Sequence, residues 1–356
     1  MAFASPAGRH WFVLDEEDVL WGCVSSQFGM PSDSSEVPLQ RIVWEGTRPA
    51  IADICCGGGH TLLLDQGGAV WCSGEGMLIG FTQVPYLPKI VRIAAGGAHC
   101  LALDERGGVW SWAVGDDSDE GGCVGRLSSP LEALPVEGLP PIRQIACGFQ
   151  FSLAEAMDGS LWSFGSNNDG QLGIGHKEPS IQPASVVIPH FPDGPLRGLH
   201  AGGQNGLLID SNGGCWTSGW HYGLLGRCGD PTIFQRIEGL PPLESAWTGY
   251  SHVFALDEDE CVWVWGFNEE GMLGLGENVD VPKPVKNQNF CGLVSVASGS
   301  QLSLITLNDG RLMGAGNAVA NSLCIPHNHL PFETPFRPTR SLNPQKSARS
   351  SSTQGN

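Results

Sequence analysis

Short apolar runs alternate with glycine-rich turns along most of the chain, and their order recurs. In residues 90–110 a first apolar run, 90–95, ends at Gly96, and a second, 99–103, ends at a Gly-Gly turn before Val109 and Trp110. Runs of this length, bounded by glycine, are typical of β-strands. Asp-Gly or Asn-Gly in the turn of several copies favours tight hairpins. The pattern therefore predicts a series of small antiparallel sheets.

The same frame occurs seven times, the first copy being truncated at its amino end. The residue that follows the hairpin turn lies at Trp21, Trp71, Trp110, Trp162, Trp216, Trp263 and Met313. The glycine that ends the first strand lies at Gly57, Gly96, Gly148, Gly202, Gly249 and Gly299, with Ala7 in the first copy. Both sets have the same six spacings, so no insertion falls inside the module. One such sheet cannot bury both faces, and radial stacking of seven predicts an all-β, seven-bladed β-propeller.

Composition supports this architecture and sets its limits. Glycine supplies 50 of 356 residues, about twice ordinary usage, and disfavours a helical protein, while 41 % hydrophobic residues suffice for a core. We expect one propeller over residues 1–336, followed by a disordered, basic and Ser-rich tail over 337–356. Because only Met1–Ala7 precede the first module, we also expect residues 317–336 to supply a strand that completes a shared blade.

Charge and targeting signals restrict the partners. The formal net charge is −18, and residues 337–356 contain four basic residues and no acid, so the preceding residues carry 15 basic and 37 acidic groups, or −22. This balance argues against nucleic acid as a partner, and it serves either solubility or a basic protein partner. Without a signal peptide, a membrane-length apolar run or a CxxC motif, the twelve cysteines indicate reduced thiols. We expect a monomer in the cytoplasm or nucleus, with no membrane insertion.

Two segments resemble the regulator of chromosome condensation repeat. They are residues 161–175 (LWSFGSNNDGQLGIG) and 264–276 (VWGFNEEGMLGLG), and weaker copies extend the resemblance over about residues 7–325. The resemblance implies a seven-bladed β-propeller. Residues 147–151 and the blade that follows also resemble the secretion-regulating guanine-nucleotide exchange factor branch. The residues that precede the histidine position are Gly59, Ala98, Gln150, Gln204, Ser251 and Gln301. None is acidic, which departs from the nuclear Ran exchange factor and argues against Ran exchange.

The candidate chemistry is sparse. His60, His99 and His252 share one repeat position, and His10 is a plausible fourth. They are either catalytic bases or metal ligands, or hydrogen-bonding pegs repeated once per blade, and their separation around the ring favours pegs. No residue spacing indicates a catalytic constellation, a metal site or a bound cofactor.

One segment breaks the repeat. Residues 113–125 replace the usual Asn-x-x-Gly-Gln-Leu-Gly turn with a longer loop that carries Asp116, Asp117, Asp119 and Glu120. It is either a solvated loop or a protruding contact element. In exchange factors of the resembled family a blade insertion contacts the GTPase beside its nucleotide site. Those four acids are therefore the candidate partner-binding residues.

Three functions fit this sequence. The first is a guanine-nucleotide exchange factor or regulator of a small GTPase, which needs no covalent chemistry because it favours the nucleotide-free state. The second is a non-enzymatic scaffold or adaptor that binds a protein partner through its loops. A receptor or inhibitor on the same fold has less support.

Overall fold

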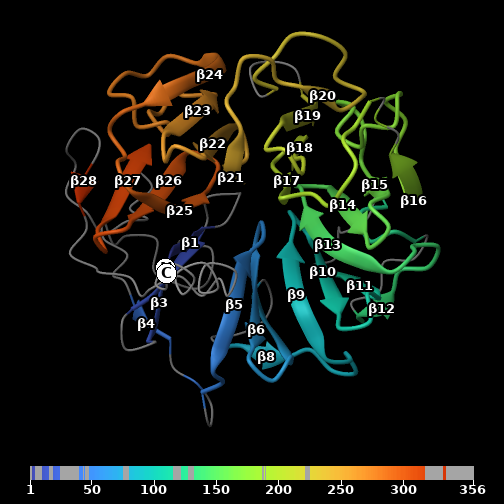
Figure 1. Ribbon diagram of the computed structural model, residues 1–356. Helices are drawn as coiled ribbons and strands as arrows, with labels where there is room; N and C mark the ends of the chain where they lie inside the picture. Colours follow the sequence, from blue (N-terminus) through green and yellow to red (C-terminus); the bar gives the residue numbers. More distant parts are fainter. Residues whose placement is uncertain are drawn as a thin grey trace, which may run out of the picture.

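The computed structural model describes the strands and most of the loops between residues 48 and 316. The described residues are 2–4, 10–15, 19–24, 40–42, 44, 48–74, 80–114, 122–126, 132–186, 188, 190–220, 225–316 and 332–333. They contain seven four-stranded antiparallel sheets, each formed by consecutive strands. Figure 1 shows these sheets arranged around a common centre, with the fourth strands at the periphery.

The strand bounds repeat from sheet to sheet. The first sheet contains β1 (Ala2–Ala4), β2 (His10–Leu14), β3 (Leu20–Val24) and β4 (Gln40–Arg41). The next two contain β5 (Ile51–Cys56), β6 (His60–Asp65), β7 (Val70–Gly74) and β8 (Thr82–Gln83), then β9 (Ile90–Ala95), β10 (His99–Asp104), β11 (Val109–Ala113) and β12 (Leu134–Pro135). The central pair contains β13 (Ile142–Cys147), β14 (Phe151–Ala156), β15 (Leu161–Gly165) and β16 (Ser180–Val186), then β17 (Gly198–Ala201), β18 (Asn205–Ile209), β19 (Cys215–Gly219) and β20 (Gln235–Arg236). The last two contain β21 (Leu243–Thr248), β22 (His252–Asp257), β23 (Val262–Gly266) and β24 (Val281–Asn287), then β25 (Leu293–Ser298), β26 (Leu302–Leu307), β27 (Leu312–Gly316) and β28 (Phe332–Glu333).

The predicted all-β propeller is confirmed, but six of the seven predicted blades are described. Six sheets, from β5–β8 to β25–β28, are described as packed blades. In the β1–β4 sheet most strand side chains lie outside the described residues, so the structure describes six such blades rather than seven.

The expected shared blade is wrong. Strand β28 pairs with β27 of its own sheet, through Met313 with Glu333 and Gly314 with Phe332. The first sheet takes its opening strand from the amino terminus instead, because β1 pairs with β2 from Ala2 to Ala4. Three residues are thus enough for an opening strand, and the first sheet does not need the carboxyl-terminal segment.

Each module has two kinds of connection, which define two faces of the ring. The loops between first and second strands, which we call the loop face, are 57–59, 96–98, 148–150, 202–204, 249–251 and 299–301. The hairpin turns between second and third strands lie at the opposite ends of the strands, on what we call the turn face. The predicted hairpin glycines Gly159, Gly213 and Gly310 have φ of 86°, 84° and 84°, a region that glycine adopts readily.

An aspartate stabilises most of these turns and anchors the tryptophan that follows. In Asp104 one carboxylate oxygen accepts the backbone N–H groups of Arg106 and Gly108, and the other accepts the indole N–H of Trp110 at 3.1 Å. Four further pairs with the same six-residue separation are Asp15–Trp21, Asp65–Trp71, Asp210–Trp216 and Asp257–Trp263. The tryptophans are therefore both packing and hydrogen-bonding groups, whereas the repeat alone indicates only packing.

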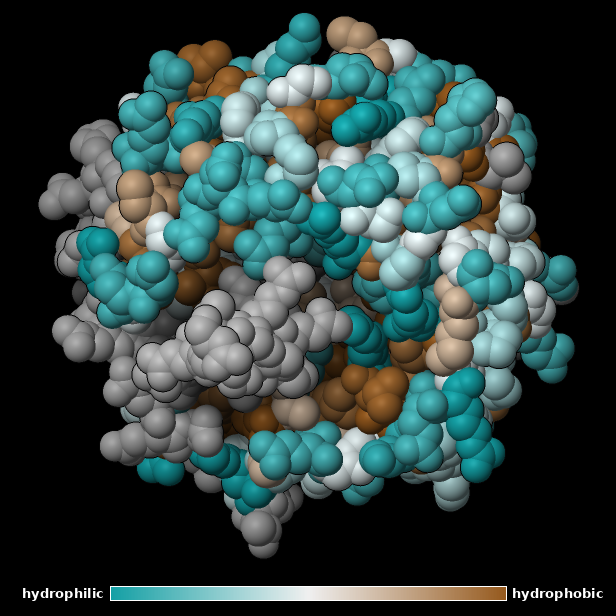
Figure 2. All heavy atoms as spheres, in the orientation of Figure 1, coloured by the Kyte–Doolittle hydropathy of each residue, from teal (hydrophilic) through white to brown (hydrophobic). Residues whose placement is uncertain are grey.

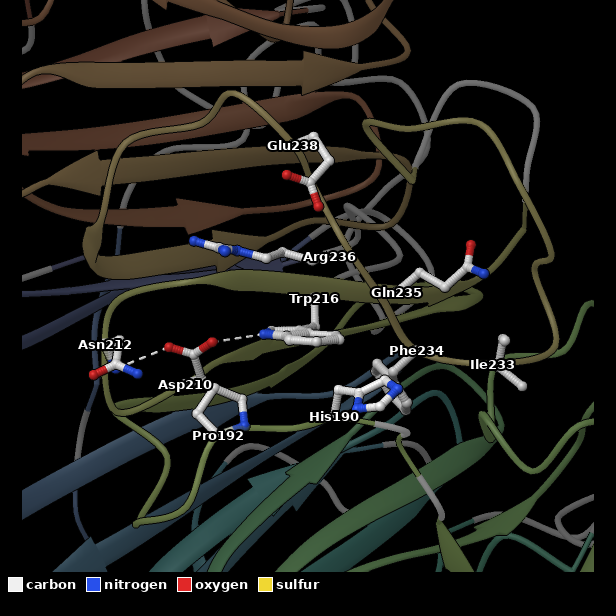
Figure 3. A pocket seen from close by; sticks show the side chains of 10 residues that line it. All are labelled: His190, Pro192, Asp210, Asn212, Trp216, Ile233, Phe234, Gln235, Arg236 and Glu238. Atoms are coloured by element: carbon white, nitrogen blue, oxygen red, sulfur yellow. Dashed lines mark hydrogen bonds between the residues drawn. The ribbon is translucent and has the colours of Figure 1, made fainter.

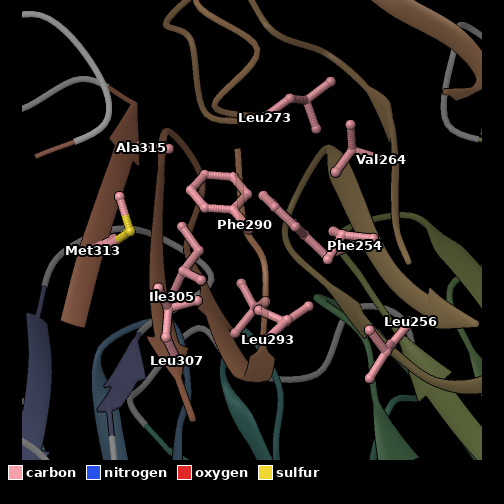
Figure 4. Close-up of a cluster of buried hydrophobic side chains, with 12 residues drawn as sticks. Phe254, Leu256, Val264, Leu273, Phe290, Leu293, Ile305, Leu307, Met313 and Ala315 are labelled. Atoms are coloured by element: carbon pink, nitrogen blue, oxygen red, sulfur yellow. The ribbon is translucent and has the colours of Figure 1, made fainter. Parts of the chain in front are cut away.

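The core consists of apolar clusters between neighbouring sheets. Figure 4 shows the cluster between β21–β24 and β25–β28, where Phe254 and Phe290 lie with ring centroids 6.1 Å apart. Leu273, from the loop after β23, is fully buried in the same cluster. Asn268 holds that loop in place, because its carbonyl oxygen accepts the N–H of Leu273 and its amide donates to the carbonyl of Glu277. The repeat signature therefore positions a core residue between two blades.

Candidate functional site

The glycines at the repeat position close the loops of the loop face. In all six loops the glycine N–H donates to the carbonyl of the residue three positions later, at 2.7–2.9 Å. A Cβ on Gly96 would lie 2.5 Å from the carbonyl oxygen of Gly148 in the next blade. A Cβ on Gly249 would lie 2.8 Å from that of Gly299. Glycine is thus required by close approach between blades. The six glycines are Gly57, Gly96, Gly148, Gly202, Gly249 and Gly299.

Two repeat histidines link neighbouring blades. His99 Nε2 lies 3.0 Å from Ser152 Oγ, and His252 Nε2 lies 2.7 Å from Ser303 Oγ. Each serine hydroxyl donates in turn to a backbone carbonyl, so the imidazole N–H is the donor to the serine. Burial lowers the pKa of His99 to about 4 and that of His252 to about 3. These side chains are therefore neutral structural links near pH 7, and His60 is equally buried.

Backbone hydrogen bonds join the loops of the loop face to one another. The N–H of Gly97 donates to Phe149 O at 2.7 Å, that of Gly203 to Tyr250 O at 3.1 Å, and that of Tyr250 to Gly299 O at 3.1 Å. Gly58 and Phe149 donate in the same direction to the loops that follow them. This relay of main-chain bonds connects six consecutive loops and fixes their spacing around the centre.

Four aromatic side chains lie on part of this relay. Phe149 and Tyr250 meet edge to face with ring centroids 5.4 Å apart, and Trp220 stacks on Phe267 with centroids 5.2 Å apart. All four are half-buried. The backbone N–H of Trp220 bonds to Gln204 O beside the relay. We call these four residues the aromatic surface, and it spans the blades from β13 to β24.

Acidic groups flank the aromatic surface. Exposed Glu269 and half-buried Glu270 lie two and three residues after Phe267, in the loop after β23. The predicted partner-binding residues Asp116, Asp117, Asp119 and Glu120 lie outside the described residues. The described residues on either side of them lie at the loop face: Val114 N bonds to Ala98 O, and Cys123 O accepts the hydroxyl of Ser152. The described residues before and after the acidic segment thus lie beside the loops 96–98 and 148–150.

The described residues show little that indicates chemistry at this face. They contain no cluster of three or more histidine, cysteine or carboxylate groups able to hold a metal ion. The ten described cysteines are free thiols, and burial raises the pKa of Cys56 and Cys72 to about 12. No helix among the described residues is long and apolar enough to cross a membrane. What this face offers is shape, aromatic area and negative charge, which serve binding.

Sequence reasoning did not identify the aromatic surface, although a signal exists. Phe149 and Tyr250 follow the repeat glycine directly, where three other copies have Gly58, Gly97 and Gly203. This replacement of glycine by an aromatic residue at one face is the sequence signal that could have identified the aromatic surface.

Figure 2 shows one face of the molecule covered mainly by hydrophilic residues, with hydrophobic side chains near β9 beside a central hollow.

Comparisons with known proteins agree with this geometry. Residues 158–209 and 259–306 match the regulator of chromosome condensation (RCC1) repeat, and residues 142–171 match a second form of that repeat. The ultraviolet-B receptor UVR8 of Arabidopsis thaliana is 29 % identical over 216 residues, which cover 58 % of this chain and 48 % of the receptor.

A yeast sequence relative and a yeast crystal structure extend the comparison. The guanine nucleotide exchange factor SRM1 of Saccharomyces cerevisiae is 30 % identical over 241 residues, which cover 62 % of this chain and 50 % of SRM1. The crystal structure of Prp20p from Saccharomyces cerevisiae superposes with a TM-score of 0.74 at 21 % identity, over 90 % of this chain and 83 % of Prp20p. The chain thus spans about half the length of UVR8 and of SRM1.

Proposed function

Because the chain carries regulator of chromosome condensation repeats, as its sequence predicts, we propose that it binds a small GTPase at the loop face and promotes nucleotide exchange. SRM1 is a guanine nucleotide exchange factor, and the structure of Prp20p was reported with its binding properties to Gsp1p and histones. Nucleotide exchange requires no catalytic group on the propeller, because an exchange factor acts by favouring the nucleotide-free state of the GTPase.

The observation that carries the proposal is the continuity of the loop face. The aromatic surface and the chain on either side of the acidic segment are joined by one backbone relay. Aromatic rings are enriched at the centres of protein interfaces. Carboxylates beside them favour a partner with basic groups near its nucleotide site, such as a phosphate-binding lysine. A surface that binds the nucleotide-free GTPase better than the loaded one increases nucleotide release by shifting the population.

A nucleotide-release assay tests this function. Fluorescent GDP is loaded on a panel of small GTPases, and release is followed with and without the full chain. We expect at least one member to release nucleotide about tenfold faster or more, an acceleration of about 1.4 kcal/mol in barrier. Two loop-face variants, Phe149→Ala with Tyr250→Ala and Asp116→Ala with Asp117→Ala, are expected to lose most of that acceleration.

A matched variant controls for charge. Glu137→Gln with Glu238→Gln removes two exposed acids beside the turn face and is expected to leave release unchanged. If no GTPase is accelerated, exchange activity is refuted. Binding without acceleration would favour the adaptor function instead.

We also infer that the β1–β4 sheet is the seventh blade of one propeller that covers residues 1–336. Strand β1 lies against β25, β26 and β5, and Phe12, Leu14 and Leu20 pack with residues of the β5–β8 sheet. Both neighbours of a closing blade are therefore in contact with it. Residues 337–356 lie outside the described residues, and we propose that they form a separate tail. The protein is proposed to be a monomer in the cytoplasm or nucleus.

Truncation tests this organisation. Removing residues 341–356 is expected to leave the cooperative thermal transition unchanged. Ending the chain at Ala315 removes β28 and is expected to abolish that transition, because the last blade loses its outer strand. Cooperative unfolding of the shorter chain would contradict the proposed boundaries, and light scattering of the full chain tests the monomer.

A further inference from the structure

A cavity of about 530 Å³ opens beside the β17–β20 blade, away from the aromatic surface. Residues from three segments line it: the linker after β16, the hairpin turn between β18 and β19, and the end of the blade around β20. Figure 3 shows Arg236 and His190 on opposite sides of Trp216, with Glu238 beyond Arg236. A volume of this size suits a small organic molecule, for which pockets of roughly 300–1,000 Å³ are usual.

The linker that forms one wall is unusually long. Residues 187–197 connect β16 to β17, whereas 84–89, 136–141 and 237–242 make the corresponding connections elsewhere. His190 in this linker has φ of 59°, a left-handed conformation that disfavours residues other than glycine. Backbone strain of this kind tends to persist at ligand-binding positions. The longer linker thus adds a wall to the turn face and places an exposed imidazole at the cavity.

Two carboxylates line the cavity: Asp210 is already engaged, and Glu238 is exposed to solvent. Asp210 accepts the N–H groups of Asn212 and Gly214, each at 2.8 Å, and the indole N–H of Trp216 at 2.7 Å. Its negative charge is therefore used within the hairpin turn, and a ligand meets the backbone and indole groups around it.

The guanidinium opposite is not engaged in the same way. Arg236 crosses the turn so closely that a Cβ on Gly214 would lie 3.2 Å from its Nε. Among the described residues no ion pair includes Arg236, and no hydrogen bond from its guanidinium is present. The cavity thus presents one unpaired guanidinium and one exposed imidazole beside Trp216 and Phe234.

We propose that this cavity binds a small molecule that combines a flat ring with an anionic group, either a carboxylate or a phosphate. The anion lies at Arg236, where a planar guanidinium binds two oxygens at once, and His190 donates the second set of contacts. The ring packs on the aromatic side chains of the cavity. A free anion would otherwise avoid a protein of net charge −18, so binding requires a local cation.

Titrations of the full chain with four probes test the site, and ligand-observed nuclear magnetic resonance measures the binding of each probe. Benzoate and phenyl phosphate carry both features, inorganic phosphate carries only the anion, and benzyl alcohol carries only the ring. We expect benzoate or phenyl phosphate to bind at one site at least tenfold more tightly than either single-feature probe. Which of the two binds more tightly distinguishes a carboxylate ligand from a phosphate ligand.

Three variants locate the binding. Arg236→Gln is expected to weaken binding at least tenfold, and His190→Gly about threefold while relieving the strained backbone. Arg106→Gln, an exposed arginine in the turn of another blade, is the matched control and is expected to change affinity less than twofold. Equal loss in Arg106→Gln and Arg236→Gln, or no difference among the four probes, would overturn the proposal. Thermal unfolding of each variant confirms that the fold is intact.

Discussion

Two junctions between neighbouring blades bury their polar link at opposite ends. Between β9–β12 and β13–β16 the link is His99 to Ser152 near the loop face, and the turn-face end is apolar. Between β13–β16 and β17–β20 the loop-face end holds Phe151, and the link is Glu155 near the turn face. The Glu155 carboxylate accepts the N–H of Leu196 in the next blade at 2.7 Å. Besides the backbone relay, both junctions thus have a buried side-chain link to the next blade, but its place differs.

The next junction also has its side-chain link near the turn face, but there the link is partly exposed. Arg197 of the β17–β20 blade donates to the carbonyl of Leu243 at 3.3 Å and pairs with Glu258 at the turn face. At the loop-face end Asn205 is buried, and neither atom of its amide has a hydrogen-bond partner among the described residues. Its neighbour in the position of Ser152 is Val253. Apolar burial is therefore sufficient at either end of a junction between blades, and the side-chain hydrogen bond can lie at the other end.

The largest effect is expected when the turn-face link is broken. Glu155 is 1 % exposed and also binds Arg143 and Gln144, so Glu155→Leu leaves the N–H of Leu196 buried without an acceptor. We expect the free energy of unfolding to fall by about 1–3 kcal/mol, the cost of a buried donor without an acceptor, since Arg143 is partly solvated. Urea denaturation measures it. Glu155→Gln keeps an acceptor and is expected to cost less, and equal stability of Glu155→Leu and wild type would show that this link is dispensable.

The loop-face links are expected to make stability depend on pH. Buried His99 and His252 have lowered pKa values of about 4 and about 3, so the unfolded chain takes up protons below about pH 6.5 that the folded chain does not. Stability is therefore retained above that pH and lost as pH falls, by about 1.4 kcal/mol per pH unit for each histidine. His252→Asn should lower this slope by one such increment between pH 6.5 and 5.

The difference between wild type and variant isolates the histidine. Other groups that titrate in this pH range are unchanged in the variant, so their contributions cancel in the difference. Urea denaturation at several pH values gives both slopes, and identical slopes would exclude His252 as the titrating group.

The smallest effect is expected from transferring a link between junctions. Asn205→His with Val253→Ser installs the His–Ser pair at a junction that lacks it. The double variant is expected to gain about 1 kcal/mol, the net value of a typical hydrogen bond. Val253→Ser alone is expected to destabilise, since it buries a hydroxyl. A double-mutant cycle by urea denaturation reports the coupling, and additive effects would mean that no link forms.

What the sequence predicts here is local, and what it misses joins distant segments. The hairpins, their glycines and the repeated tryptophans follow from contacts within one module of the chain. Glu155 occupies a position that is leucine in four other modules, but its partner Leu196 lies 41 residues away in the next blade. The shared blade was a wrong prediction because a two-residue strand such as β28 carries almost no pairing signal of its own.

The candidate site follows the same division. The acidic residues from Asp116 to Glu120 break the repeat and are visible in sequence, and their role stays a prediction. The aromatic surface depends on two ring pairs from different blades, and the cavity depends on how one long linker crosses a turn. Neither arrangement is visible as a local sequence pattern, because each depends on the distance between segments of different blades or loops.

The backbone relay has a consequence for how such a protein changes over evolution. Its bonds use only main-chain atoms from Gly58 to Gly299, so no relay hydrogen bond involves a side chain. Phe149 and Tyr250 occupy positions where other loops have glycine, and the relay passes through both kinds. Mutation of the side chains of Phe149 and Tyr250 can therefore alter the partner that is recognised while the main-chain bonds are kept. The glycines at the same position are restricted, because a Cβ on Gly58, Gly97 or Gly203 would lie 2.3–2.5 Å from a carbonyl oxygen of the next loop.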